Sequence, residues 1–160
     1  MSASGVPTSG SGPEIHRARC RELDPVTLHD LIALRINVFV VEQNCPYAEL
    51  DGRDVEPGTE QVWTADELGP TACLRVLADP DGSVRVGRLC TRADARGQGL
   101  AALLLNDVLS RTAGQTVVLE AQEYLTGWYG RFGFAATGPR YLEDDIPHVP
   151  MSLRLTLAGR

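Results

Sequence analysis

The segment of this sequence with the clearest chemistry is a glycine-rich turn between an apolar strand pattern and an apolar helix pattern. Residues 84–91 have the pattern of a strand, and Arg96-Gly97-Gln98-Gly99 opens a helix that continues through Leu100-Ala101-Ala102. Glycine lets the backbone approach a ligand closely, and the first N–H groups of a helix have no partner within it. The helix dipole adds about half a positive charge there. These residues predict an anion site that suits a diphosphate.

Two other nucleotide motifs do not fit these residues. A Walker A motif requires Gly-Lys-Ser/Thr, and the chain contains no lysine. A Rossmann fingerprint places its glycines early in a βαβ unit with an acidic residue downstream, whereas these glycines follow several strands with an antiparallel pattern. Taken alone, the glycine pair is equally well explained as a tight strand-to-helix turn that binds nothing.

The composition of the chain excludes several kinds of partner. The 160 residues suit one domain, and the 43% of hydrophobic residues supply a core. Fifteen basic residues, all of them arginine, stand against 21 acidic residues, which gives a net charge of −6. Because nucleic acids and anionic lipids both require a basic surface, we expect no nucleic-acid partner and no membrane contact. The absence of lysine also excludes Schiff-base chemistry.

The four cysteines, Cys20, Cys45, Cys73 and Cys90, do not form a recognisable cluster. No pair has the C-x-x-C spacing, and no histidine lies at ligand spacing beside them, so we expect no metal site. We predict reduced and mostly buried thiols in a cytoplasmic protein. The N-terminus has neither the basic nor the apolar segment of a signal peptide, which agrees with that location.

The elements that must position the glycine turn follow from hydrophobic spacing and turn residues. Residues 1–13 are mostly Ser, Gly and Pro and predict a disordered tail before one domain at 14–160. Asp24-Pro25 suits the start of a helix, and the tetrapeptide at 79–82 suits a hairpin turn. In chain order we predict a strand at 14–20, a helix at 25–41, a long loop at 42–58 with room for a short helix, strands at 61–66, 71–78 and 84–91, a helix at 98–112, a strand at 116–121, a helix at 125–132, and strands at 134–137 and 149–157.

Two signatures in this order of elements resemble the GNAT superfamily of N-acetyltransferases. Arg96-x-x-Gly99-x-Ala101 is similar to its Gln/Arg-x-x-Gly-x-Gly/Ala signature, and Tyr129-x-x-x-Gly133-Phe is similar to its Tyr-x-x-x-Gly-Phe segment. The resemblance covers most of the chain from Glu14 onward. It implies an α/β fold with a mixed, mostly antiparallel central sheet flanked by helices.

A narrower resemblance concerns three segments that lie far apart in the chain. Residues 38–47 (VFVVEQNCPY), the acids Glu49 and Asp51, and the tripeptide Ile146-Pro147-His148 are similar to the ElaA-type subgroup of the GNAT superfamily. This subgroup implies the fold and the cofactor but not the acceptor substrate.

The superfamily resemblance implies acetyl-CoA as the acyl donor. The strand before the glycine turn would splay from its neighbour and bind the pantetheine arm through its backbone at Leu89, Cys90 and Thr91. The amide of Gln122 stands where the superfamily often has an asparagine that contacts the cofactor. The pyrophosphate would be held by the turn and the start of its helix, namely Arg96, Gly97, Gln98, Gly99, Leu100, Ala101 and Ala102.

The same resemblance implies roles in proton transfer. Tyr129 would be the general acid that protonates the leaving thiolate, although an aromatic among Trp128, Phe132 and Phe134 is also explained by core packing. The attacking amine must lose a proton, since a free alkyl ammonium has a pKa of about 10.4. Histidines titrate near neutral pH, so His148 is one candidate base, and Glu42 is another, with Glu120 and Glu123 as further carboxylates. Loop hydrogen bonding explains His148 and Glu42 as well, and we expect a structural role for Cys45.

The function that we predict is transfer of an acetyl group from acetyl-CoA directly to a primary amine of a small molecule or peptide. The alternative is an acyl-CoA-binding sensor or interaction module without turnover. Superfamily members often dimerise, so a homodimer is compatible with the resemblance. The acidic residues of 42–67 and 143–145 either attract a cationic acceptor or form a solvated surface.

Overall fold

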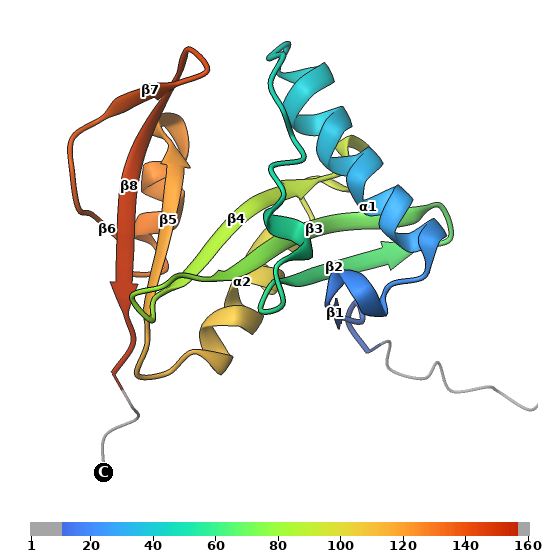
Figure 1. The fold of residues 1–160 in the computed structure, drawn as a ribbon, viewed down its shortest axis with the longest axis horizontal. Coiled ribbons are helices and arrows are strands. Elements are labelled where there is room, and N and C mark those ends of the chain that lie inside the picture. The colour runs from blue at the N-terminus through green and yellow to red at the C-terminus, as the bar shows by residue number, and fades with distance from the viewer. Residues whose placement is uncertain (1–10, 157–160) are drawn as a thin grey trace, which may run out of the picture.

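An eight-stranded sheet forms the centre of the computed structural model, which describes residues 11–156 (Figure 1). The strand order is β1-β2-β3-β4-β5-β8-β6, and β7 pairs with β8. All pairs are antiparallel except β4–β5, which confirms the predicted mixed, mostly antiparallel sheet. The strands are β1 (His16–Ala18), β2 (Glu60–Asp66), β3 (Gly69–Ala78), β4 (Val84–Thr91), β5 (Thr116–Gln122), β6 (Ala135–Ala136), β7 (Tyr141–Glu143) and β8 (Ile146–Arg154).

Three helices cover the two faces of this sheet: α1 (Pro25–Ile36), α2 (Leu100–Arg111) and α3 (Thr126–Gly130). Neighbouring residues of a strand point to opposite faces, so Val62 and Trp63 of β2 mark the two sides. Val62 packs in the larger core cluster with α2 and α3, and Trp63 packs in a smaller one with Leu31 and Leu34 of α1. Helix α1 therefore lies on one face of the sheet, and α2 and α3 lie on the other.

The start of α1 agrees with the prediction, but its end does not. Asp24 caps the helix by accepting hydrogen bonds from the backbone N–H and the hydroxyl of Thr27, at 2.9 and 2.7 Å, and Pro25 occupies the first turn. The predicted α-helix to Val41 ends at Ile36, and the chain continues as a π-helical segment, Asn37–Glu42. Hydrophobic spacing cannot separate these two forms here, because residues 38–41 are apolar without interruption and show no period.

Strands β4 and β5 separate soon after they meet. Their parallel pairing consists of Val84 with Val117 and Arg85 with Val118. Farther along, β4 stays paired to β3 as far as Thr91, and β5 stays paired to β8 as far as Gln122. The two strands diverge in Figure 1 and leave a V-shaped opening between the halves of the sheet.

A β-bulge interrupts β4 beside this opening. Cys73 of β3 faces Cys90, and Arg75 faces Gly87, so the single residue between them on β3 is opposite both Arg88 and Leu89. Arg88 adopts a left-handed backbone conformation with φ of 53°. A bulge of this kind bends a strand and re-aims its side chains. The bulge therefore sets the direction of β4 where it leaves β5.

Several predicted boundaries shift. Strands β1 and β6 are shorter than predicted, β8 begins three residues earlier, the short strand β7 was not predicted, and the loop at 42–58 contains one 3-10 turn, Arg53–Val55. Three cysteines are buried, as predicted, and Cys20 is half-buried. Residues 1–10 of the predicted tail and residue 157 of the last predicted strand lie outside the described residues. Within 11–156, no helix has the length and apolar character to cross a membrane.

Candidate active site

A cavity of about 710 Å³ occupies the opening between β4 and β5. One wall comes from the π-helical segment and β4, and includes Leu89, Cys90 and Thr91. The other wall comes from β5, α3 and β8, and includes Tyr129 and His148. The structure thus brings the predicted pantetheine-binding strand and two predicted proton-transfer residues to one cavity.

A second cavity of about 260 Å³ lies at the glycine turn. Gly97 and Gly99 adopt left-handed conformations, with φ of 79° and 74°, and a β-carbon at either position would meet no atom within 4 Å. Gly99 is the N-cap residue of α2, so the unpaired N–H groups of the first helical turn follow it directly. Of the residues predicted to hold the pyrophosphate, Gln98 is exposed and lies outside this lining, which includes Arg96, Gly97, Gly99, Leu100, Ala101 and Ala102.

Arg96 lies at the junction of the two cavities and is held by two partners. Its Nε donates to the carbonyl oxygen of Thr91 at 3.1 Å, and its Nη1 and Nη2 donate to the two carboxylate oxygens of Glu42, each at 2.5 Å. The hydrogen bond and charge of Arg96 lower the pKa of Glu42. Because a carboxylate with a lowered pKa takes up a proton less readily, this contact favours an orienting role for Glu42 over that of a base.

Tyr129 combines burial in the core with a place on the cavity wall. It is only 8% exposed and packs edge-on against Trp128 and Phe134. Burial raises the pKa of its hydroxyl to about 12. The phenol therefore keeps its proton across the neutral range, as a general acid must.

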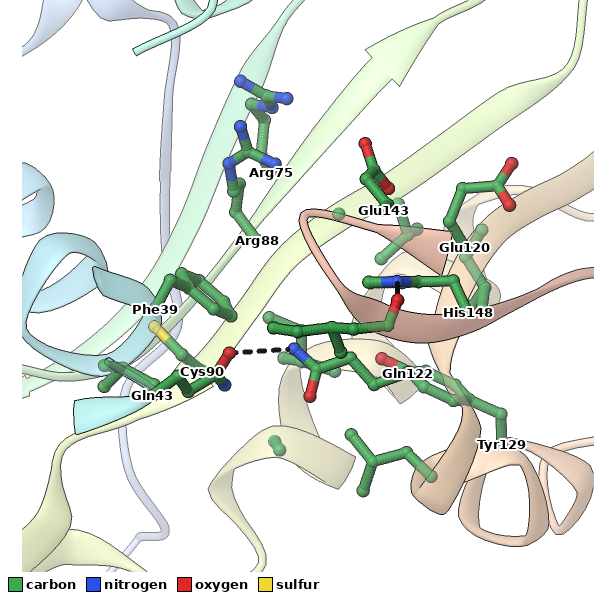
Figure 2. A pocket seen from close by; sticks show the side chains of 18 of the residues that line it. Phe39, Gln43, Arg75, Arg88, Cys90, Glu120, Gln122, Tyr129, Glu143 and His148 are labelled. Atoms are coloured by element: carbon green, nitrogen blue, oxygen red, sulfur yellow. Dashed lines mark hydrogen bonds between the residues drawn. The ribbon is translucent and has the colours of Figure 1, made fainter. Parts of the chain in front are cut away.

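His148 stands opposite Gln122 in the β5–β8 pair, and its tautomer follows from one contact. Its Nδ1 lies 2.8 Å from the carbonyl oxygen of Ile146, which can only accept a hydrogen bond (Figure 2). In the neutral imidazole, Nδ1 therefore carries the proton and Nε2 keeps a lone pair. The ring of Tyr141 stacks on the imidazole with centroids 5.9 Å apart.

The two other candidate carboxylates are already engaged. Glu120 accepts hydrogen bonds from the Tyr141 hydroxyl at 2.8 Å and from Arg85 at 3.1 Å. Glu123 pairs with Arg140 at 3.4 Å and lies outside the lining of the large cavity. Among the candidate bases in residues 11–156, His148 is thus the one whose acceptor atom has no contact with a neighbouring acid or arginine.

Two contacts cross the cavity from the residues just after the π-helical segment to the other wall. The Nε2 of Gln122 donates to the Oε1 of Gln43 at 3.1 Å, and Figure 2 shows Gln122 extending across the cavity to meet it. The buried thiol of Cys45 lies 3.7 Å from the carbonyl oxygen of Asp144, in the β7–β8 turn. The segment after α1 therefore spans the opening between the sheet halves.

A buried network of ion pairs supports the β4 wall and was not predicted. Arg35 of α1 donates to Glu49 at 2.6 Å and to Asp54 at 2.7 and 3.1 Å. Arg75 donates to both oxygens of Asp51 at 2.8 Å, and Arg88 at the bulge donates to the Glu49 carbonyl at 3.1 Å. The loop after the π-helical segment is thereby fixed to β3 and β4.

This network corrects the interpretation of the acidic stretch. Glu49 and Asp54 are 4% and 8% exposed, so these two acids neither form a solvated surface nor remain free to attract a cationic acceptor. Their arginine partners lie on α1, β3 and β4, at sequence separations that no local pattern reveals. Glu143 and Asp144 do line the mouth of the cavity. Their position is the one that the first interpretation of residues 143–145, attraction of a cationic acceptor, requires.

Comparisons with known proteins agree with this arrangement. The Acetyltransferase (GNAT) domain family matches residues 31–155. A UPF0039 protein of Mycobacterium tuberculosis is 43% identical over 141 residues, which cover 86% of this chain and 90% of that protein. The crystal structure of an acyl-CoA N-acyltransferase from Pseudomonas aeruginosa is similar with a TM-score of 0.82 and 38% identity, covering 88% of this chain and 99% of that one.

Protein ElaA of Escherichia coli is a further relative, 36% identical over 139 residues that cover 82% of this chain and 90% of ElaA. Its crystal structure is similar with a TM-score of 0.81 over 88% of this chain and 98% of the ElaA chain. The splayed strands, the glycine turn and these matches lead to one conclusion. The chain belongs to the GNAT acetyltransferase family, with its relatives in the ElaA-type subgroup.

Proposed function

We propose that this protein transfers an acetyl group from acetyl-CoA directly to a primary amine of a small molecule or peptide. The observation that supports this most is that the Tyr129 hydroxyl and His148 border the same cavity as β4, next to a glycine turn suited to a diphosphate. The donor supplies an activated thioester carbonyl. Every other part of the reaction is assigned to residues of this chain.

The donor fits the residues present. N–H groups at the start of α2 and the side chain of Arg96 would hold the pyrophosphate, because the chain has no lysine for this task. Within residues 11–156, the edge of β4 at Leu89, Cys90 and Thr91 has no strand partner on its β5 side, so the backbone groups that point to that side, apart from the Thr91 carbonyl bound by Arg96, are available to bind the pantetheine arm. A backbone N–H at Leu89 or Cys90 would stabilise the oxyanion.

Two proton transfers complete the proposed reaction. His148 Nε2 removes a proton from the attacking amine as the new N–C bond forms. Tyr129 gives its proton to the sulfur as the C–S bond breaks, which releases the free thiol. The carboxylates of Glu143 and Asp144 line the cavity and have no ion-pair partner among residues 11–156, which favours acceptors that carry positive charge.

A thiol-release assay tests this proposal against binding without turnover. Acetyl-CoA is mixed with the protein and with a panel of monoamines, polyamines and peptides, and free thiol is measured over time. We expect release above the acceptor-free rate with at least one amine, and an acceptor mass increased by one acetyl group. Stabilisation by acetyl-CoA in a thermal-shift assay with no thiol release over the whole panel would favour the sensor alternative.

A further inference from the structure

Glu42 and Gln43 are neighbours in the chain but contact opposite sides of the cavity. Glu42, the last residue of the π-helical segment, binds Arg96 on the glycine-turn side. Gln43 binds Gln122 at the end of β5. Strands β4 and β5 do not pair with each other at this level, so these two side chains connect the sheet halves where the sheet itself does not.

The contact of Glu42 leaves Arg96 oriented and still able to bind a further anion. A guanidinium has five N–H donors in a fixed plane. Thr91 takes the Nε donor, and Glu42 takes one donor from each terminal nitrogen. One N–H on each terminal nitrogen therefore remains for phosphate oxygens. Since Arg96 is about 43% exposed, its side chain would adopt many rotamers without these two partners.

The contact of Gln43 fixes the amide of Gln122 in the same way. Because the Gln122 nitrogen donates to Gln43 Oε1, the carbonyl oxygen of the Gln122 amide is left as an acceptor within the cavity. Both side chains thus keep unused hydrogen-bonding groups in a fixed direction. Pre-orientation of this kind reduces the entropy lost on binding.

We propose that Glu42 and Gln43 are positioning residues that hold Arg96 and Gln122 ready for acetyl-CoA, one on each side of the cavity. This inference rests on the proposed function for the identity of the ligand. It replaces proton transfer by Glu42 with orientation of the phosphate-binding arginine.

The first test is a double-mutant cycle on cofactor affinity. The dissociation constant of CoA is measured by isothermal titration calorimetry for the wild type, Glu42→Gln, Arg96→Gln and the double variant. We expect Glu42→Gln to weaken CoA binding by about tenfold, and to have no further effect once Arg96 is replaced. Glu42→Asp, which keeps the charge, should restore part of the affinity.

Each outcome of this cycle decides between explanations. Unchanged or tighter binding of CoA by Glu42→Gln would overturn the proposal. The ion pair would then have no effect on phosphate binding, or it would compete with the phosphate for Arg96. A fall in kcat with unchanged affinity would return Glu42 to the role of a base. If the wild type itself binds no CoA, it is the proposed function that fails, and this result is recognised before any variant is compared.

A second cycle tests the other side of the cavity. Gln43→Met keeps the side-chain length but removes the acceptor for Gln122. We expect it to raise the KM for acetyl-CoA about fivefold to tenfold with little change in kcat, and to add nothing in a Gln122→Met background. Additive effects in the two backgrounds would contradict a role through Gln122.

Val41→Ala is the matched control for both cycles. Val41 immediately precedes Glu42 and Gln43 in the chain, is 66% exposed and lies outside the cavity lining. It should leave the CoA affinity and the KM unchanged. Urea unfolding of every variant separates loss of orientation from loss of the fold.

Discussion

The imidazole of His148 and the ring of Tyr141 lie face to face, with centroids 5.9 Å apart and planes inclined by 27°. The two residues are also direct partners in the β7–β8 pair. Nδ1 contacts the Ile146 carbonyl, so the neutral form of the imidazole keeps its lone pair on Nε2, and the ring of Tyr141 packs on one face of the imidazole. The geometry suits a base that must meet its substrate without reorganisation.

This relationship predicts different effects for two variants of Tyr141. Tyr141→Phe keeps the stacked ring and should retain a kcat near that of the wild type. Tyr141→Ala removes the ring and should lower kcat, while His148→Gln should lower it by about 10²-fold or more. The kinetics of thiol release give these values. If kcat falls as much in Tyr141→Phe as in Tyr141→Ala, the effect comes from the contact of the Tyr141 hydroxyl with Glu120 instead.

Replacement of Tyr129 should separate chemistry from binding. Tyr129→Phe keeps the ring packing against Trp128 and Phe134, so CoA affinity and the free energy of unfolding should change little. The kcat should fall by about 10²-fold, the usual contribution of a general acid. Unaltered thiol release would contradict the assigned role.

The raised pKa of Tyr129 also predicts a pH profile. The neutral phenol is the active form, and it is lost only as the pH rises through about 12. We therefore expect no loss of kcat from this group between pH 7 and 10, the range that a stopped assay of thiol release can cover. A basic limb near pH 9 that disappears in Tyr129→Phe would contradict an acid with this pKa.

Gly99→Ala should weaken cofactor binding beyond its effect on stability. The left-handed backbone at Gly99 costs a non-glycine residue about 1–2 kcal/mol, and the added methyl group would point into the cavity at the turn. Gly82 in the β3–β4 turn has a similar φ of 87° and equally open surroundings, but it lies outside the lining of both cavities. Gly82→Ala should cost similar stability in urea unfolding and leave CoA affinity intact.

Loss of Arg35 should be the most damaging change to stability outside the apolar core. Arg35→Met keeps the volume but leaves Glu49 and Asp54 buried without their main partner, which costs about 3–5 kcal/mol. Urea unfolding measures the difference, with Arg131→Met as an exposed control that should change it by less than about 0.5 kcal/mol. Equal effects of the two variants would show that the network contributes little.

The same network predicts sensitivity to acid. Burial alone would raise the pKa of Asp54 and Asp51, but their arginine partners lower it in both cases. A lowered folded-state pKa contributes stability above the unfolded value, near 3.9, and this contribution is lost as the pH falls through the folded value. The urea midpoint should therefore fall steeply below pH 4, and less so in Asp51→Asn. If the urea midpoint falls equally with pH in the wild type and in Asp51→Asn, the ion pair of Asp51 is not the source of the acid sensitivity.

The sequence is sufficient to predict the parts of this protein that depend on local patterns. The cap at Asp24, the glycine turn and the hairpin turn at 79–82 each follow from residues close in the chain. Family signatures then identify the fold, since they record the spacing of the glycine turn and Tyr129. These features need no knowledge of long-range contacts.

The features that the sequence does not reveal depend on partners far apart in the chain. The apolar run at 38–41 has no period that separates a π-helix from an α-helix, and the residue with the left-handed backbone at the bulge is Arg88 rather than its neighbour Gly87. The partners in the Glu42–Arg96 ion pair are 54 residues apart. Only the folded chain shows that this acid contacts that arginine.

The two-pair ladder between β4 and β5 also bears on how the molecule unfolds. Strands β1 to β4 form one set of antiparallel neighbours, and β5 to β8 form another. Apart from the core shared beneath α2 and the ion pair between Arg85 and Glu120, the two sets meet through Val84–Val117 and Arg85–Val118. So short a ladder passes little cooperativity from one set to the other, and partial opening should begin there. Amide hydrogen exchange at the ends of β4 and β5 should therefore slow when CoA binds, because the ligand then fills the space where these two strands form no hydrogen bonds with each other.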